Sequence, residues 1–397
     1  MKNTPKKWRR NVLFFLTGQA ASLFGSTLAY YAIIWHITIS TGSGTIMTLF
    51  LLAATIPTVL MSPIGGVLAD RFNRRWLINI ADGAIALVTA AIILMYGLGF
   101  ENYWLLLVCI AIRAFGQGIQ TPAVGAMIPQ LVPKEKLARY NGLNGTVQMV
   151  SMLFSPMAAA VLITILPVHQ ILSIDIFTAI FSITILFALV KVKNPPGANK
   201  ETGYLTEFKD GVKYILHNNF LKVFLGLLGI FVIFMTPVSS LLPLDVTRTF
   251  GGDGWQLGAI EVAFVVGGLI GSAIITAWGG FKKRKHTLVL VATVFGLATM
   301  ALGLTNNIWL YLAILLIAGV MGGFFNPVAN TLLQTKTDEK YLGRVYGVQN
   351  IIISSAMPIG LILFGPLADV ISINWILLGT GLIMALLAIA FTSKKLD

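Results

Sequence analysis

Four ionisable side chains, Arg113, Asp82, Asp175 and Glu261, stand inside long apolar runs of this chain. A carboxylate withdrawn from water can take up a proton and release it when its exposure changes, and a buried guanidinium can hold a polar ligand. These residue types therefore suit the coupling of proton movement to solute movement. We take Glu261 as the best candidate for a proton carrier, with Asp82, Asp175 and Arg113 as further candidates. For each acid, a structural pair with Arg113 or with backbone groups is an equal alternative, and Asp82 lies close enough to the cytoplasmic side to pair with a loop cation instead.

Arg113 begins a polar stripe that continues through Gln117 and Gln120. The spacing of i, i+4 and i+7 places these side chains on one face of a helix. Arg113 lies about ten residues into its apolar run, roughly 15 Å along a helix. We expect this face to line a substrate cavity, while the alternative is a cation that only holds helices together.

Other side chains at helical spacing fit the same cavity. A large amphiphile needs apolar contact area and few obligatory charges. Any one such stripe is more often used for hydrogen bonds between membrane helices, so the prediction depends on the set as a whole. The candidate cavity residues outside the Arg113 stripe are Gln19, Ser22, Ser26, Tyr30, Phe231, Phe234, Met235, Asn326 and Asn330.

The elements that must position these residues are membrane-spanning helices. Of the 397 residues, 56% are hydrophobic and 11% charged, and the mean hydropathy is +0.84, which is too apolar for a soluble domain. Every Lys and Arg except Arg113 and Arg248 falls in the gaps on one side of the apolar runs. Because cationic loops stay in the cytoplasm, we predict twelve spans with both termini cytoplasmic.

The predicted fold is all-α, with two pseudo-symmetric bundles of six transmembrane helices each. We expect an N-terminal bundle over residues 1–190, a polar cytoplasmic linker over 191–222 and a C-terminal bundle over 223–397. The predicted spans are 12–37, 46–69, 76–97, 103–127, 143–166, 170–190, 223–246, 256–280, 286–304, 308–333, 346–368 and 372–392.

The two halves also resemble each other at a constant offset, which indicates duplication. The pairs that match are Gly118 with Gly323, Pro122 with Pro327, Leu137 with Leu342, Arg139 with Arg344 and Gly142 with Gly347. Two parallel six-helix repeats with a site at their interface are typical of transporters that work by alternating access.

Several function classes are excluded. The net charge of +13 is divided among short loops and forms no continuous basic face, so we expect no nucleic-acid partner. Cys109 is the single cysteine, and the four histidines lack metal-ligand spacing, so we expect no metal and no cofactor. The sequence shows no cluster of catalytic residues that would indicate an enzyme. It also shows no phosphate-binding loop that would indicate ATP hydrolysis, so an ion gradient remains as the energy source.

The segment from Gly66 to Arg75 follows the second predicted span at its cytoplasmic end. It resembles a signature of the major facilitator superfamily, with Asn73 where glycine is usual. In that family the segment acts as a conformational latch, a role that the resemblance gives to Gly66, Asp70, Arg71 and Arg75. The alternative is that its arginines only enforce topology.

Three further strings resemble Mef-type macrolide efflux proteins: Tyr341–Tyr346, Ala356–Leu363 and Leu367–Asp369. The likeness continues through Gly18–Ala20, Thr121–Ala123 and Leu131–Pro133, and so covers most of the chain. It implies a proton-driven antiporter that exports macrolide-like drugs and contributes to antibiotic resistance. The fifth span has only Ser155-Pro156 where many such antiporters carry a glycine-rich motif, so the direction of transport depends on the whole-chain likeness.

We therefore expect a monomeric, multi-pass protein of the bacterial cytoplasmic membrane whose partners are a small amphiphilic substrate, protons and the lipid bilayer. One alternative is an exporter or importer of another amphiphile, such as a siderophore, a lysolipid or a peptide antibiotic. A non-transporting membrane partner is the remaining alternative.

Overall fold

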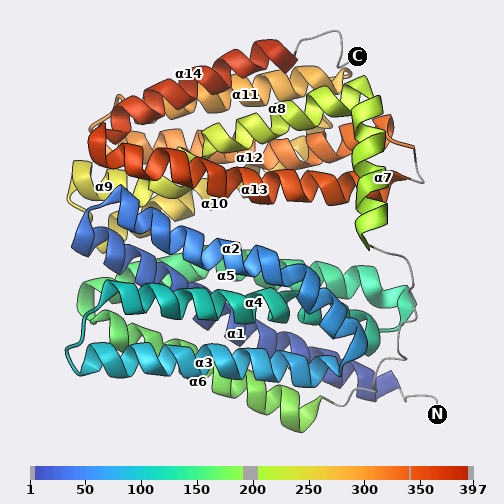
Figure 1. The fold of residues 1–397 in the computed structure, drawn as a ribbon, viewed down its shortest axis with the longest axis vertical. Helices are drawn as coiled ribbons and strands as arrows, with labels where there is room; N and C mark the ends of the chain where they lie inside the picture. The colour runs from blue at the N-terminus through green and yellow to red at the C-terminus, as the bar shows by residue number, and fades with distance from the viewer. Residues whose placement is uncertain (1–4, 191–203, 339–340, 392–397) are drawn as a thin grey trace. The chain divides into compact units, whose positions relative to one another are not determined.

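The computed structural model of this protein describes residues 5–190, 204–338 and 341–391, and all of its regular elements there are helices (Figure 1). Eleven of the described helical segments are long and apolar enough to cross a membrane, and Ile373–Ile389 is a shorter twelfth. The all-α membrane fold is confirmed. Contacts between residues divide the chain into two compact units, residues 1–40 with 49–199 and residues 41–48 with 200–397.

The helices of the first unit follow one another through short connections. They pack mainly through α3, which contacts both α4 and α6. In order they are α1 (Pro5–Thr41), α2 (Gly44–Arg71), α3 (Arg74–Gly97), α4 (Tyr103–Leu131), a 3₁₀ turn (Lys134–Lys136), α5 (Leu137–Ile165) and α6 (Val168–Leu189).

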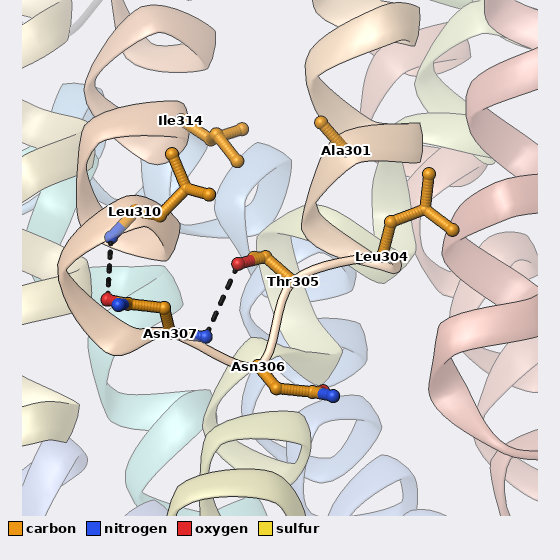
Figure 2. Close-up of a pocket in the computed structure, with 7 residues that line it drawn as sticks. All are labelled: Ala301, Leu304, Thr305, Asn306, Asn307, Leu310 and Ile314. Carbon is orange, nitrogen blue, oxygen red and sulfur yellow. Dashed lines mark hydrogen bonds between the residues drawn. The ribbon is translucent and has the colours of Figure 1, made fainter.

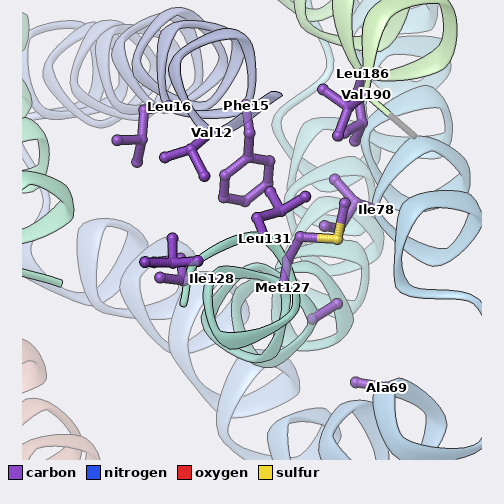
Figure 3. Packing of buried hydrophobic residues seen from close by; sticks show 12 residues of the cluster. Val12, Phe15, Leu16, Ala69, Ile78, Met127, Ile128, Leu131, Leu186 and Val190 are labelled. Carbon is purple, nitrogen blue, oxygen red and sulfur yellow. The ribbon is translucent and has the colours of Figure 1, made fainter. Parts of the chain in front are cut away.

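The basic end of the first unit, where α1 and α5 begin, contains an apolar core to which five helices contribute buried residues. Phe15 of α1 packs among Ile78 of α3, Met127 of α4 and Leu186 of α6, all almost fully buried (Figure 3). Trp8 and Tyr140 are partly buried against the same cluster. This core fixes the start of α1 and the start of α5 relative to α3 and α4.

The second unit begins with a surface helix and continues with the remaining apolar helices. In order they are α7 (Tyr204–His217), α8 (Asn219–Thr236), a π-helical turn (Pro237–Leu241), α9 (Leu242–Phe250), α10 (Gly254–Trp278), α11 (Arg284–Leu302), α12 (Ile308–Lys336), α13 (Leu342–Val370) and α14 (Ile373–Phe391). The predicted span 223–246 is thus interrupted by a π-helical turn. Within the predicted linker, 191–203 lie outside the described residues, and α7 and the start of α8 occupy the rest.

Glycines set the closest helix contact of the second unit, between α10 and α12. A Cβ added to Gly267 would collide with the carbonyl oxygen of Leu316, and one added to Gly319 would collide with that of Phe264. Small residues four apart let membrane helices approach to backbone contact. The two helices therefore form a tight pair.

The units share local structure at the positions that the sequence offset pairs. Asn102 caps α4 by accepting from the N–H of Trp104 at 2.9 Å, and Asn307 caps α12 by accepting from the N–H of Trp309 at 2.9 Å. An asparagine at this position satisfies backbone donors that the first helical turn leaves open. Each unit thus begins its fourth long helix with the same asparagine cap, followed by Trp-Leu at the same two positions.

Candidate functional site

Four helices of the first unit meet at the carboxylate of Asp175, in α6. Arg113 of α4 donates from Nη1 to Oδ2 of Asp175 at 2.7 Å, and their side chains are 11% and 1% exposed. Thr89 of α3 donates to the same oxygen at 2.9 Å, and Ser26 of α1 donates to Oδ1 at 2.9 Å. Arg113 also donates to the Thr89 hydroxyl. Arg113 and Asp175 therefore form an ion pair, which is the structural alternative considered above for this acid.

A second carboxylate lies in the same unit without a cation. Asp82 of α3 is buried, and Ser22 and Gln120 lie beside its carboxyl group. Gln120 also donates to Oε1 of Gln19 at 3.2 Å. Within the described residues Oδ2 of Asp82 has no hydrogen-bond partner and its carboxylate has no ion pair, so pairing with a loop cation is not what places it there.

Polar side chains recur on the face of α3 that carries Asp82, with the buried Ile85 and Ile92 between them. Asp82, Thr89 and Tyr96 recur every seventh residue and are all buried, and Tyr96 meets the His36 ring edge-to-face with 5.7 Å between ring centroids. Residues seven apart lie on one side of a helix. The carboxyl group of Asp82 and the hydroxyl groups of Thr89 and Tyr96 therefore form a row along α3 inside the first unit.

A small cavity of about 40 Å³ adjoins the Arg113 pair. It has room for water but not for a drug-sized ligand. It brings together Ser26, Tyr30, Arg113 and Gln117 from the sequence prediction and adds apolar walls from Ile33, Ile34, Ala54, Ile110 and Ala114. Water at this position would lie beside the polar side chains of Ser26, Arg113 and Gln117.

The candidate cavity residues of the second unit have diverse environments. Phe231 is 2% exposed, and its ring stacks on Phe325 with centroids 5.3 Å apart, so it presents almost no surface to a ligand. Phe234 packs against Phe364. Met235 is half-buried, and Asn326 and Asn330 are exposed on α12.

The acids of the second unit include one that sequence reasoning missed. Glu261 is half-buried in α10. Asp245 of α9 is 3% exposed and accepts a hydrogen bond from the Tyr311 hydroxyl of α12 at 2.7 Å. Its position near Arg248, at the end of the predicted span, gave no sign of burial. The one signal in the sequence was Tyr311 in the predicted tenth span, a hydroxyl with no obvious polar residue nearby in the sequence to bind it.

The predicted latch residues are held within the first unit. Asp70 pairs with Arg74 at 3.4 Å, and Arg74 also donates from Nη1 to the carbonyl oxygen of Ala126 at 2.7 Å. Arg75 donates to the carbonyl oxygen of Phe187, and its guanidinium lies 5.0 Å from the Phe187 ring centroid. Arg71 is exposed. Arg74, which the sequence analysis left out of the latch, is thus the member that joins α2, α3 and α4.

The glycines before this segment differ in their surroundings. A Cβ on Gly65 would clash with the carbonyl oxygen of Gly118, so Gly65 allows α2 to touch α4. Gly66 faces open space. Of these two glycines, only Gly65 is needed for close approach between helices.

A larger hollow, of about 730 Å³, lies at the turn between α11 and α12 (Figure 2). Its seven lining residues include none of the predicted cavity residues. Its two dashed hydrogen bonds run from Asn307 N–H to the Thr305 hydroxyl and from Leu310 N–H to Asn307 Oδ1, each 3.3 Å. They form the cap of α12, and the walls are mostly apolar. We assign it no ligand.

The described residues contain no cluster of His, Cys, Asp and Glu that could hold a metal ion. Cys109 is buried. The interactions present at the Arg113 site are hydrogen bonds and an ion pair.

Comparison with known proteins gives consistent matches over the whole chain. A family model described as "Transmembrane secretion effector" matches residues 10–397. Macrolide efflux protein A of Streptococcus pyogenes is 30% identical over 387 residues, 96% of this chain and 95% of that protein. The protein of the same name from Enterococcus faecalis is 29% identical over 327 residues, 81% of this chain and 100% of that protein.

Among solved structures, a bacterial homologue of the iron transporter ferroportin in its inward-facing state aligns with a TM-score of 0.75. The alignment covers 97% of this chain and 99% of that one, at 17% sequence identity. At that identity the likeness speaks for the fold alone.

Proposed function

This chain belongs to the transmembrane secretion effector family of major facilitator transporters, and from that premise we propose that it exports amphiphilic, macrolide-like molecules in exchange for protons. It is a transporter and not an enzyme. The observation that supports this substrate class is the 30% identity, over nearly the full length of both chains, to macrolide efflux protein A. Movement of the two halves between inward-open and outward-open states would carry the drug across the membrane.

Proton coupling is proposed from the two buried carboxylates of the first unit. Arg113 neutralises Asp175 directly, whereas Asp82 has no cation and one oxygen without a partner among the described residues. A proton on Asp82 removes the cost of its buried charge. We propose that Asp82 accepts a proton from outside and releases it to the cytoplasm.

The drug itself is proposed to contact polar and aromatic side chains of both units. A macrolide-like molecule is larger than the cavity beside Arg113, so that cavity serves water and protons and the drug needs a wider site. The proposed contacts are Gln19, Ser22, Ser26, Tyr30, Arg113, Gln117, Gln120, Phe231, Phe234, Met235, Asn326 and Asn330. Of these Phe231 requires a conformation in which its ring leaves the stack with Phe325.

Accumulation assays test the transport proposal. Cells of a drug-sensitive host that express the chain should hold less radiolabelled macrolide than cells with the empty vector, and a protonophore should restore the drug content. In membrane vesicles turned inside out, an imposed proton gradient should drive macrolide uptake. Equal drug content in both cell lines for every macrolide tested would show that the substrate class is wrong. Equal uptake with and without the proton gradient would show that transport is not coupled to protons.

Orientation is proposed from the positive charge in the loops: both termini and the latch segment lie in the cytoplasm. The chain has one cysteine, Cys109, so a Cys109→Ser background accepts single reporters. An impermeant maleimide should label Asn306→Cys on intact cells and Lys282→Cys only after the membrane is opened. Labelling of Lys282→Cys on intact cells would reverse the proposed orientation.

A further inference from the structure

A hollow of about 140 Å³ lies at the basic end of the first unit, apart from the Arg113 site. It is lined by Trp8, Arg9, Lys136, Arg139 and Tyr140. The rings of Trp8 and Tyr140 meet edge-to-face with centroids 5.6 Å apart, and the Arg9 guanidinium lies 5.6 Å from the Trp8 ring centroid. Three cationic side chains therefore surround a pair of aromatic rings.

No described carboxylate pairs with the positive charge of this hollow: none of the ion pairs among the described residues involves Arg9, Lys136 or Arg139. The nearest acid in sequence, Glu135, is exposed in the 3₁₀ turn and is not part of the lining. The first turn of α5 also lacks an acidic residue, and its N-cap residue, Lys136, makes no side-chain cap. The start of a helix carries partial positive charge, so the backbone adds to the same field.

The second unit shows how an anion is placed at the matching position. Arg344, the partner of Arg139 in the sequence repeat, pairs with the carboxylate of Asp210 from α7 at 3.5 Å. An aromatic pair accompanies it, with Tyr214 of α7 stacked on Tyr341 at 4.2 Å between ring centroids. The N-cap residues Tyr341 and Lys136 have nearly the same backbone angles. In the second unit Asp210 provides a carboxylate for Arg344, whereas in the first unit no described carboxylate pairs with Arg139.

We propose that the hollow of the first unit binds the phosphate of an anionic phospholipid headgroup. Two or three cations around one phosphate match the chemistry of such sites between membrane helices. The phosphate would take the position that Asp210 takes beside Arg344 in the second unit. On the orientation proposed above, the lipid belongs to the cytoplasmic leaflet.

The aromatic pair favours a lipid over a free anion. Trp8 and Tyr140 rest on the apolar core of the first unit, and tryptophan and tyrosine gather at the level of the headgroups. A lipid phosphate arrives with a glycerol backbone and acyl chains that can cover such rings. Inorganic phosphate would leave them in contact with water. The shared chemistry is phosphate recognition, and the two sources can be separated by experiment.

Native mass spectrometry of the full-length protein tests the proposal. The purified, delipidated chain is titrated with phosphatidylglycerol or, as the zwitterionic comparison, with phosphatidylcholine of the same acyl chains. We expect one tightly bound phosphatidylglycerol and no equivalent phosphatidylcholine. In the double variant Arg9→Gln/Arg139→Gln that lipid should bind roughly 30-fold more weakly, because each basic residue near an anionic surface contributes about one factor of five.

The chain supplies a matched control. Arg10→Gln/Arg344→Gln removes two arginines as well, one adjacent to Arg9 and one at the repeat position of Arg139 that Asp210 already occupies. This control should keep the bound phosphatidylglycerol, and Arg9→Lys/Arg139→Lys should keep most of it. Thermal melting in detergent should be unchanged by the glutamine variant at the hollow, since both of its arginines are exposed.

Two results would overturn the proposal. Equal loss of phosphatidylglycerol from the hollow variant and the matched control would make the binding a general charge effect. Displacement of the lipid by inorganic phosphate at equal concentration would assign the hollow to a soluble anion. Both readouts are independent of drug transport, so failure here and failure of the proposed function remain distinguishable.

Discussion

Arg113 donates to the carboxylate of Asp175 at 2.7 Å, and Thr89 donates to the same oxygen at 2.9 Å. The carboxylate is 1% exposed, so the pair is satisfied inside the first unit and has little contact with water. Asp82, buried in the same unit, has no such partner among the described residues. One buried acid is therefore held in an ion pair, and the other has none among the described residues.

The Arg113 pair should be essential for stability. Asp175→Asn leaves the guanidinium buried without its anion, which typically costs about 3–5 kcal/mol. We expect a markedly lower melting temperature in detergent and no uphill drug transport. The double variant Arg113→Gln/Asp175→Asn removes both charges and should regain much of the lost stability. A double variant no more stable than Asp175→Asn would contradict this account.

An exposed ion pair provides the comparison. Asp70 is 60% exposed and pairs with Arg74 one helical turn away. Such pairs contribute about 0–1 kcal/mol, so Asp70→Asn should melt near the wild-type temperature. If it also impairs transport while it folds normally, the effect belongs to the proposed latch.

Asp82→Asn should separate proton coupling from drug binding. The amide has nearly the same shape but cannot exchange a proton, so we expect macrolide binding within about threefold of wild type and loss of transport driven by an imposed proton gradient. Drug exchange across vesicles without a gradient should persist. Normal gradient-driven uptake in this variant would eliminate Asp82 as the proton carrier.

Glu261→Gln tests the candidate that the sequence favoured. Because Glu261 is half-buried in α10, whereas Asp82 is buried and has no ion pair among the described residues, the geometry favours Asp82. We expect Glu261→Gln to retain part of its gradient-driven uptake. Complete loss with binding intact, alongside a functional Asp82→Asn, would return the role to Glu261.

Contact between α10 and α12 should depend on Gly319. A methyl group there would meet the carbonyl oxygen of Phe264, whereas on Gly322 of the same helix its nearest neighbour would be a Phe264 ring atom 3.7 Å away. Overpacking against backbone costs about 1–3 kcal/mol. Gly319→Ala should therefore lower the melting temperature, and Gly322→Ala should not. Equal melting of the two variants would show that the helices can separate at little cost.

The Tyr311 hydroxyl should stabilise the buried carboxylate of Asp245. Tyr311→Phe removes the 2.7 Å hydrogen bond and leaves Thr249, at 3.4 Å, as a weak partner. Losing one partner of a buried polar group costs about 1–3 kcal/mol. Tyr346→Phe is the control, because its hydroxyl makes only an exposed contact of 3.4 Å with the Asn330 carbonyl. Similar melting of both variants would contradict a structural role for this pair.

Sequence alone predicted the fold class because hydrophobic length and loop charge act locally along the chain. It also named Arg113, Asp82 and Asp175, since each is rare and costly inside an apolar run. It could not predict that Arg113 pairs with Asp175, because the partner of Arg113 depends on how α3, α4 and α6 pack. Arg74 and Asp245 were missed for a related reason: both lie near the ends of apolar runs, where sequence does not distinguish a solvated charge from a buried one.

The π-helical turn, Pro237–Leu241, changes the register of the seventh span. In a regular helix the buried side of Leu225 and Val232 would continue to Ser239, yet Ser239 is exposed and Ser240 is buried. One additional residue per turn corresponds to about 100° of rotation. If Pro237–Leu241 became a regular α-helix, the segment that carries Asp245 would therefore have to rotate by about 100° relative to α8. The same change would bury Ser239 and expose Ser240.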